Sequence, residues 1–234
     1  MIAIITYDAP HRKTQDLVTR LILNGHTQLH LVVTPWVKRK NFQPIFTHRP
    51  TNKVEVTIEH LAARLRIDFT KINVDELNNF FNNNKFEHIL IGGAGILPQE
   101  LVEDHKLING HPGYLPYVKG LDALKWAIYH GHPIGVTTHY VSSKTDEGEL
   151  IDRHRVPVYF EDTFHSVAHR VYETEIDMLV DSIQLIENKA ATFESLADDQ
   201  YQANRRMSHH LERIMMHRFN QLREKALSRQ VRNH

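Results

Sequence analysis

The sequence predicts an α/β fold in which helices flank a mostly parallel β-sheet. Short apolar runs typical of buried strands alternate along the chain with amphipathic helical patterns. The first three segments have the strand–helix–strand order of a parallel crossover unit. Hydrophobic residues make up 41% of the chain, which is enough for a sizeable core.

The first half of the chain begins with the strand expected at residues 1–7. A helical pattern follows and ends at the stop signal Asn24-Gly25, after which residues 29–34 form the next strand. Residues 35–52 are polar, basic and interrupted by proline, so we expect a long loop of the kind that is often functional. Two helices are then expected, around residues 56–66 and 74–81.

The second half contains the sharper patterns. The elements expected there are a strand at 86–91, a helical turn at 98–103, a very short strand at 107–109, a helix at 123–130, strands at 135–141 and 149–158, and a long helix at 164–186. Together with the first half they indicate a Rossmann-like sheet in a catalytic domain spanning residues 1–190.

Residues 191–234 are expected to form a helical, basic C-terminal extension. Between residues 204 and 234, eight Lys and Arg residues stand against Glu212 and Glu224, a local charge of +6. Apolar residues recur there near helical spacing. Such a helix either docks on the domain with a solvated basic face or grips an anionic ligand, a partner subunit or RNA.

Composition excludes several classes of function. The absence of cysteine rules out disulfides, thiolate nucleophiles and cysteine-ligated metals. The 18 histidines lack metal-ligand spacing, so we expect no metal. No stretch approaches the roughly 18–20 apolar residues of a membrane span, and no leader pattern precedes the first strand, so we expect a cytoplasmic protein without a membrane partner.

Three loops follow predicted strands, at residues 92–97, 109–116 and 142–148. Ligands of open, mostly parallel sheets bind outside the carboxyl ends of the strands, where such loops converge. The loop Gly92-Gly93-Ala94-Gly95 does not complete a glycine-rich phosphate motif, so it does not by itself indicate a nucleotide.

Asn109, His111 and Asp146 are the candidate catalytic residues. Alternation along an extended strand places Asn109 and His111 on one face, ~6–7 Å apart, and Pro112 keeps His111 extended. An amide and an imidazole in one pocket suit a reaction that develops negative charge on oxygen. A carboxylate such as Asp146 favours an imidazolium and can orient a water. Each segment could instead be an ordinary polar turn.

Three ordered motifs distinguish these alternatives. Residues 109–116 read Asn-Gly-His-Pro-Gly-Tyr-Leu-Pro, residues 135–141 read Gly-Val-Thr-Thr-His-Tyr-Val, and residues 146–151 read Asp-Glu-Gly-Glu-Leu-Ile. In order and spacing they resemble the motifs of the formyltransferase family, which includes glycinamide ribonucleotide, methionyl-tRNA and sugar N-formyltransferases. Gly120 and the helix that follows it also match. The resemblance is strong over residues 86–158 and weaker before them.

The resemblance implies direct formyl transfer from the cofactor 10-formyltetrahydrofolate to a small-molecule amine. Asn109 and His111 would stabilise the oxyanion, and Asp146 would position a water and support the His charge. The pterin would lie between two loops whose matching residues are Gly93, Ala94, Gly95, Ile96, Leu97, Ser142, Ser143, Lys144 and Thr145.

Departures from the family's sequence pattern narrow the choice of the amine that accepts the formyl group. The first loop, residues 6–11, lacks the glycine-rich phosphate loop of the purine enzymes, and a helical tail stands where methionyl-tRNA enzymes append a β-barrel. The chain also begins at the first strand, without the regulatory module of formyltetrahydrofolate hydrolases. We therefore expect a nucleotide-linked amino sugar of surface-polysaccharide synthesis, such as lipopolysaccharide. Lys38-Arg39-Lys40, Arg12-Lys13 or the tail could meet its diphosphate.

Alternatives remain open at this level. Gly110 replaces a bulkier family residue and is expected to relax the strand end. Glycinamide ribonucleotide or methionyl-tRNA are the other acceptors. A protein of another class, a non-catalytic Rossmann-like binder of folate or RNA, is opposed by the three intact residues. A homodimer is compatible with the sequence, and we do not expect nucleic acid as a partner.

Overall fold

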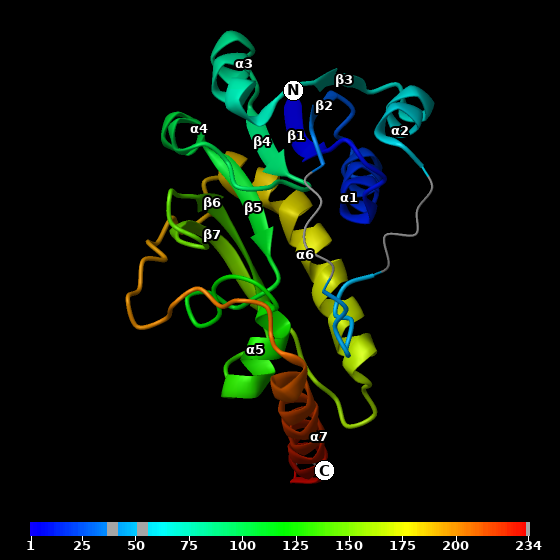
Figure 1. The fold of residues 1–234 in the computed structure, drawn as a ribbon, viewed down its shortest axis with the longest axis vertical. Helices are drawn as coiled ribbons and strands as arrows, with labels where there is room; N and C mark the ends of the chain where they lie inside the picture. The colour runs from blue at the N-terminus through cyan, green and yellow to red at the C-terminus, as the bar shows by residue number, and fades with distance from the viewer. Residues whose placement is uncertain (37–41, 51–55, 233–234) are drawn as a thin grey trace.

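Seven strands form one sheet in the order β3-β2-β1-β4-β5-β6-β7 (Figure 1). The computed structural model describes residues 1–36, 42–50 and 56–232, without the side chains of residues 229–232. Neighbouring strands from β3 to β5 pair in parallel, whereas β6 and β7 are antiparallel additions at one edge. The predicted mostly parallel α/β sheet is therefore confirmed.

The elements have the following bounds. The strands are β1 (Ile2–Tyr7), β2 (Leu29–Thr34), β3 (Asp68–Lys71), β4 (His88–Ile91), β5 (Leu107–His111), β6 (Gly135–Val141) and β7 (Gly148–Arg155). The helices are α1 (Arg12–Leu23), α2 (Ile58–Leu65), α3 (Leu77–Asn83), α4 (Gln99–Asp104), α5 (Ala123–His130), α6 (Phe164–Glu187) and α7 (His209–Arg232), and a 3-10 turn, η1 (Val74–Glu76), precedes α3.

Two strands differ from the sequence prediction. The edge strand β3 has mostly exposed side chains and no apolar run, so only its backbone pairing with β2 reveals it. β5 extends to His111 instead of ending at Asn109, because β6 pairs with it as far as His111↔Thr137. The candidate histidine therefore lies on the strand itself.

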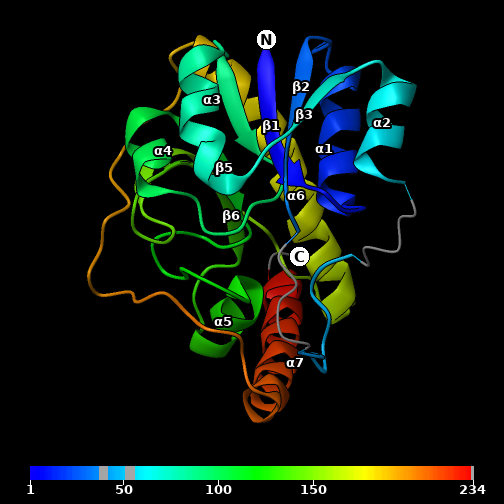
Figure 2. The same cartoon turned by 45° about the horizontal axis from the view of Figure 1, so that its top comes forward.

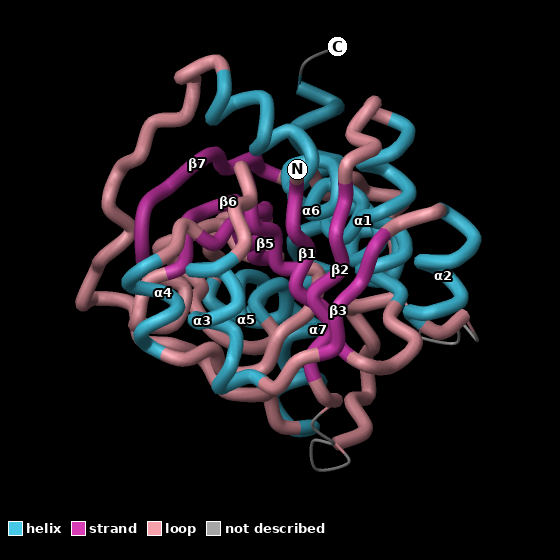
Figure 3. Tube along the Cα trace, turned by 90° about the horizontal axis from the view of Figure 1, so that it is seen from above, coloured by secondary structure: helices cyan, strands magenta, loops and turns pink. Residues whose placement is uncertain are grey.

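Helices cover both faces of the sheet (Figure 3). On one face, Leu17 and Leu21 of α1 and Leu179 of α6 join a core cluster with the strand residues Ile4 and Leu31. On the other face, α3 and α4 pack against the alternate residues of β1 and β4. Each large side chain buried in this way contributes roughly 1.5–3 kcal/mol.

The C-terminal helix α7 docks beside α5, away from the main sheet (Figures 1 and 2). Met215 and Phe219 are fully buried in a cluster shared by α5, α6 and α7, and their spacing gives α7 its apolar face. The tail is therefore a helix that docks on the rest of the domain.

A buried ion pair fixes the position of α7. The Lys125 ammonium from α5 donates to Oε1 of Glu212 from α7, and both side chains are fully buried. The other oxygen, Glu212 Oε2, accepts the Ile45 N–H at 2.7 Å. One carboxylate therefore joins α5, α7 and the segment 42–50.

Lys125→Met is expected to destabilise the fold by about 3–5 kcal/mol, because it leaves the Glu212 carboxylate buried without its cation. Unfolding in urea monitored by circular dichroism measures this loss. The double variant Lys125→Met/Glu212→Leu removes both charges and should recover most of it. A loss below about 1 kcal/mol in the single variant would contradict the role of the pair.

Candidate active site

Asn109 lies on β5 opposite His139 of β6. Its Nδ2 is 3.4 Å from His139 Nε2, while His139 Nδ1 is 3.0 Å from the Tyr140 carbonyl. Burial lowers the pKa of His139 to about 4, so this ring is neutral near pH 7. Sequence reasoning did not single out His139 as a site residue, although it lies within the Gly-Val-Thr-Thr-His-Tyr-Val motif.

His111 lies at the end of β5 and is only 5% exposed. Its Nε2 is 2.7 Å from the Val118 carbonyl, and its Nδ1 is 3.4 Å from Oδ1 of Asp146. Both ring nitrogens therefore face oxygen atoms. A histidine donates on both sides only when it is doubly protonated.

Asp146 reaches this ring from the loop between β6 and β7. Its backbone is in the left-handed region, with φ 52°, a conformation that Asp adopts more readily than most residues. Its Oδ2 accepts the Gly120 N–H at 2.6 Å, which leaves Oδ1 facing His111. The structure thus brings the three sequence-predicted candidates to one end of β5.

Two glycines allow the close packing around the histidine. A Cβ on Gly113 would lie 2.6 Å from His111 Nε2. A Cβ on Gly110 would lie 2.9 Å from Leu179 Cγ and 3.1 Å from Glu175 Cγ. Glycine at position 110 therefore lets α6 pack directly on the strand.

A largely buried salt bridge anchors the loop that carries Asp146. Lys119 Nζ donates to Glu147 Oε1 at 2.7 Å and to the Asp198 carbonyl at 2.9 Å, and its side chain is 2% exposed. This hydrogen bond lowers the pKa of Glu147. The pair connects the segment after β5, the Asp146 loop and the C-terminal segment.

A cluster that sequence reasoning missed lies behind β5. Lys13 Nζ from α1 is 2.6 Å from Glu175 Oε1 of α6 and 3.5 Å from the Gly110 carbonyl, and Arg49 is 3.2 Å from the other carboxylate oxygen. Burial raises the pKa of Glu175, but Arg49 and Lys13 lower it by more, so the carboxylate stays ionised. The sequence signal that could have revealed this cluster is Glu175, a charged residue among the buried, mostly apolar residues of α6.

The nine residues predicted for the cofactor lie on the β4–α4 loop and the β6–β7 loop. Ala94 and Leu97 of the first loop and Val141, just before the second, pack against the same core cluster. Ile96 is 96% exposed, and a Cβ added to Gly95 would meet no atom within 4 Å. Among the described residues, no protein acceptor takes the N–H groups of residues 94–97. Open space and free donors suit a flat, polar ligand.

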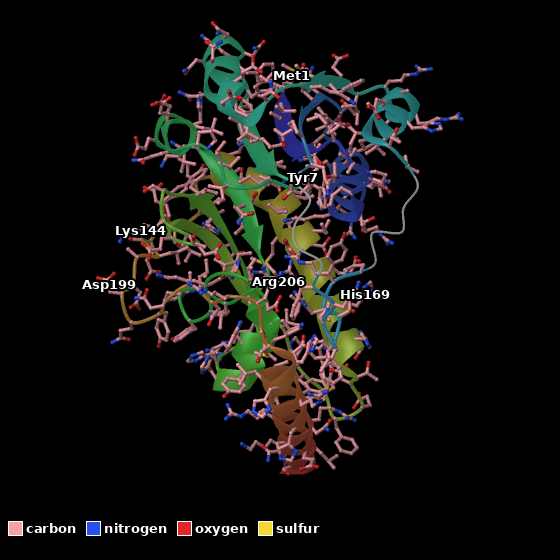
Figure 4. All side chains as sticks on the ribbon, viewed as in Figure 1. Met1, Tyr7, Lys144, His169, Asp199 and Arg206 are labelled. Carbon is pink, nitrogen blue, oxygen red and sulfur yellow. The ribbon has the colours of Figure 1, made fainter. Side chains whose placement is uncertain are left out.

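The aromatic ring of Tyr7 borders this region at the end of β1. It meets Trp36 edge-on at 4.7 Å and His11 at 5.4 Å, and its hydroxyl donates to the Ala94 carbonyl. Figure 4 shows Tyr7 and Lys144 on opposite sides of the β5 end. Trp36 is 47% exposed, so part of its ring is available to a ligand.

The basic residues predicted to meet a diphosphate, possible metal ligands and possible membrane-spanning helices can be checked in the structure. Lys38-Arg39-Lys40 lies outside the described residues, and Arg12 pairs with Asp16 on its own helix. Within residues 1–36, 42–50 and 56–232, no group of three His, Asp or Glu side chains could hold a metal ion. None of the helices in that part of the chain combines the length and hydropathy needed to cross a bilayer.

Comparison with known proteins gives a consistent result. A family profile described as formyl transferase matches residues 15–183. A methionyl-tRNA formyltransferase from Thermosynechococcus vestitus is 28% identical over 116 residues, 48% of this chain and 35% of that protein. The first curated relatives match over 33% to 40% of their own length, so the chain spans well under two thirds of them.

Solved structures share the fold at low sequence identity. A likely sugar N-formyltransferase from Mycobacterium tuberculosis superposes with TM-score 0.63 and 18% identity, over 92% of this chain and 86% of that one. Phosphoribosylglycinamide formyltransferase from Anaplasma phagocytophilum superposes with TM-score 0.60 and 21% identity, over 85% of this chain and 95% of that one. A formyltransferase from Anoxybacillus kamchatkensis was solved in complex with UDP-4,6-dideoxy-4-formamido-L-AltNAc and tetrahydrofolate. It superposes with TM-score 0.52 and 20% identity, over 86% of this chain and 85% of that one.

Acid is expected to weaken the fold between about pH 6.5 and 4. Burial lowers the pKa of His11, His48 and His139 from 6.5 to about 4. The unfolded chain takes up these protons as pH falls below 6.5, whereas the folded chain does not. Each histidine therefore removes up to ~1.4 kcal/mol of unfolding free energy per pH unit in that window.

Urea unfolding of His139→Gln at several pH values measures this effect. The slope of unfolding free energy against pH should fall by up to ~1.4 kcal/mol per pH unit, whatever the overall stability of the variant. His60→Gln, on the exposed side of α2, is the matched control and should keep the parental slope. An unchanged slope in His139→Gln would show that this ring does not stay neutral.

Proposed function

Because the chain belongs to the formyl transferase family, we propose that it transfers a formyl group from 10-formyltetrahydrofolate to a primary amine. The observation that carries the proposal is the convergence of Asn109, His111 and Asp146 at the end of β5, with His111 Nδ1 3.4 Å from Asp146 Oδ1. The loop with the free N–H groups of residues 94–97 follows the neighbouring strand β4, and the loop that carries Asp146 follows β6.

The two loops fit the formyl donor. The N–H groups of residues 94–97 can take the polar edge of a pterin, and Ile96, 96% exposed, can cover its face. Ser142, Ser143, Lys144 and Thr145 would close the other side. When bound, the donor supplies an electrophilic formyl carbon whose oxygen gains negative charge as the amine attacks.

Asn109 supplies the neutral donor to that oxygen in this proposal. Its Nδ2 now faces His139 Nε2 at 3.4 Å, which is a long contact that a better acceptor can replace. Since His139 is neutral, it accepts from the amide and holds it without competing as a cation.

His111 and Asp146 act as a coupled pair. The Asp146 carboxylate faces Nδ1 of the ring at 3.4 Å, and a protonated His111 can stabilise an oxyanion or give a proton toward the leaving nitrogen. Gly120 holds Asp146 through the other oxygen, so the carboxylate does not turn away. His111 must relinquish the Val118 carbonyl if it is to donate through Nε2.

For the acceptor, we propose a nucleotide-linked amino sugar. Trp36, which is 47% exposed, offers an aromatic face just after β2 for stacking on a base or sugar. Lys13 and Arg49 both pair with Glu175, and Arg49 is 44% exposed and can reach a phosphate. The Anoxybacillus structure with a UDP-linked formamido sugar supports the same class. Glycinamide ribonucleotide and methionyl-tRNA are the competing acceptors.

The decisive assay incubates the protein with 10-formyltetrahydrofolate and each of three amines: a panel of nucleotide-linked amino sugars, glycinamide ribonucleotide and methionyl-tRNA. Formylation of one sugar supports the full proposal. Formylation of either other amine replaces the acceptor but retains the chemistry. Release of free formate alone indicates hydrolysis, and folate binding without turnover indicates a non-catalytic binder.

Asn109→Ala is expected to lower kcat by about 10²–10³, because removal of one oxyanion donor commonly costs roughly 3–4 kcal/mol of barrier. The measurement is steady-state turnover with the acceptor identified above. Asn220→Ala, an exposed asparagine of α7, is the matched control and should keep parental turnover. Near-normal kcat in Asn109→Ala would refute the role of the amide.

A further inference from the structure

A groove of about 260 Å³ lies between the C-terminal end of α5 and the middle of α7. Residues of α7 that line it, Arg218, Gln221, Leu222 and Lys225, follow the i, i+3, i+4, i+7 spacing of one helix face. The wall opposite is the end of α5 with its following turn. The groove thus lies between two elements and is not a stripe on one exposed helix.

The groove has a positive lining. Arg218 and Lys225 contribute two cations from α7, and His130 and His132 lie on the facing turn. No Asp or Glu is among its lining residues. Among the side chains that the structure describes, no carboxylate pairs with either cation. The cations are therefore available to an anion from solution.

Aromatic rings adjoin these cations. The Arg218 guanidinium carbon lies 4.2 Å from the centroid of the Tyr129 ring, which holds the side chain at the groove. The His130 imidazole, which is mainly exposed, stacks on Trp126 with centroids 5.5 Å apart and an angle of 16°. His130 also meets the Tyr129 ring edge-on at 5.1 Å and the His132 ring at 5.6 Å, so a ligand ring would contact the exposed rim of this aromatic cluster.

We propose that this groove is a binding site for a phosphorylated aromatic ligand of the nucleoside-phosphate class. Arg218 and Lys225 would hold the phosphates, and the imidazoles of His130 and His132, which line the groove, would contact the ring. The volume is slightly below the range of ~300–1,000 Å³ common for small-molecule pockets, so part of the ligand would extend into solvent.

This site is separate from the proposed catalytic centre. α5 has eight residues, so its two ends lie about 12 Å apart. Asp122 at its beginning follows Gly120, whose N–H donates to Asp146, whereas the groove lies at its far end. The proposal therefore does not depend on formyl transfer.

The test uses intrinsic fluorescence. The chain has two tryptophans, so a Trp36→Phe protein reports only on Trp126 beside the groove. Titration with adenosine diphosphate should give a saturable change in emission, and inorganic pyrophosphate should bind more weakly. In this background, Arg218→Gln and Lys225→Gln should each weaken binding about tenfold, as expected for the loss of one charge-assisted contact.

Two controls keep the result interpretable. Arg213→Gln changes an exposed arginine of α7 outside the groove and should leave the affinity unchanged. Lys225→Gln preserves the Arg218–Tyr129 contact, so loss of binding in it cannot be attributed to undocking of α7. Formyl transfer by the full chain carrying Arg218→Gln/Lys225→Gln should remain at the parental level, which separates this proposal from the catalytic one.

The proposal fails if adenosine diphosphate gives no saturable change in emission up to about 10 mM, which would mean a Kd above that concentration. It also fails if the double variant Arg218→Gln/Lys225→Gln binds as tightly as its parent. Equal binding of pyrophosphate and adenosine diphosphate would overturn the stacking part and reduce the ligand to its phosphates.

Discussion

The backbone of residues 118–120 is the constraint on which the candidate active site depends. The Val118 carbonyl faces His111 at 2.7 Å, and the Gly120 N–H donates to Asp146 at 2.6 Å. Between them, the Lys119 carbonyl accepts the Asn204 N–H at 2.9 Å. Three consecutive peptide groups therefore orient the histidine, the carboxylate and the C-terminal segment. A shift of this segment would misplace both ionisable candidates together.

The C-terminal extension follows the proposed catalytic domain in sequence but is part of the same packed structure. A Cβ on Gly120, which has φ +84°, would lie 2.4 Å from the Asn204 carbonyl, so glycine permits this close contact. Met207 N–H donates to Asp122 at 3.0 Å, and Glu212 pairs with Lys125. These contacts lie immediately beside the segment that orients the site. The extension thus supports the geometry of the site, in addition to the groove proposed on its outer side.

Sequence patterns were sufficient for most of the fold and for the three central residues, because both are encoded locally. Apolar periodicity marks the strands and helices, and Asn109, His111 and Asp146 lie in short motifs. β3 was missed because an exposed edge strand has no apolar run, and the length of β5 depends on its partner β6. The Lys13–Glu175 contact joins positions more than 150 residues apart, and no local pattern encodes it. The same holds for the Asn204 contact with Lys119.

Among the described residues, three Lys–Glu pairs that are buried or largely buried surround the segment from β5 to α5: Lys13–Glu175, Lys119–Glu147 and Lys125–Glu212. A buried pair gains little net stability, because desolvation offsets much of the attraction. Such a pair instead disfavours other arrangements, because burying either charge without its partner costs free energy. Each pair joins elements distant in sequence, and each would be broken by a shift of its helix or loop. The pairs therefore favour one arrangement of the elements that carry the candidate residues.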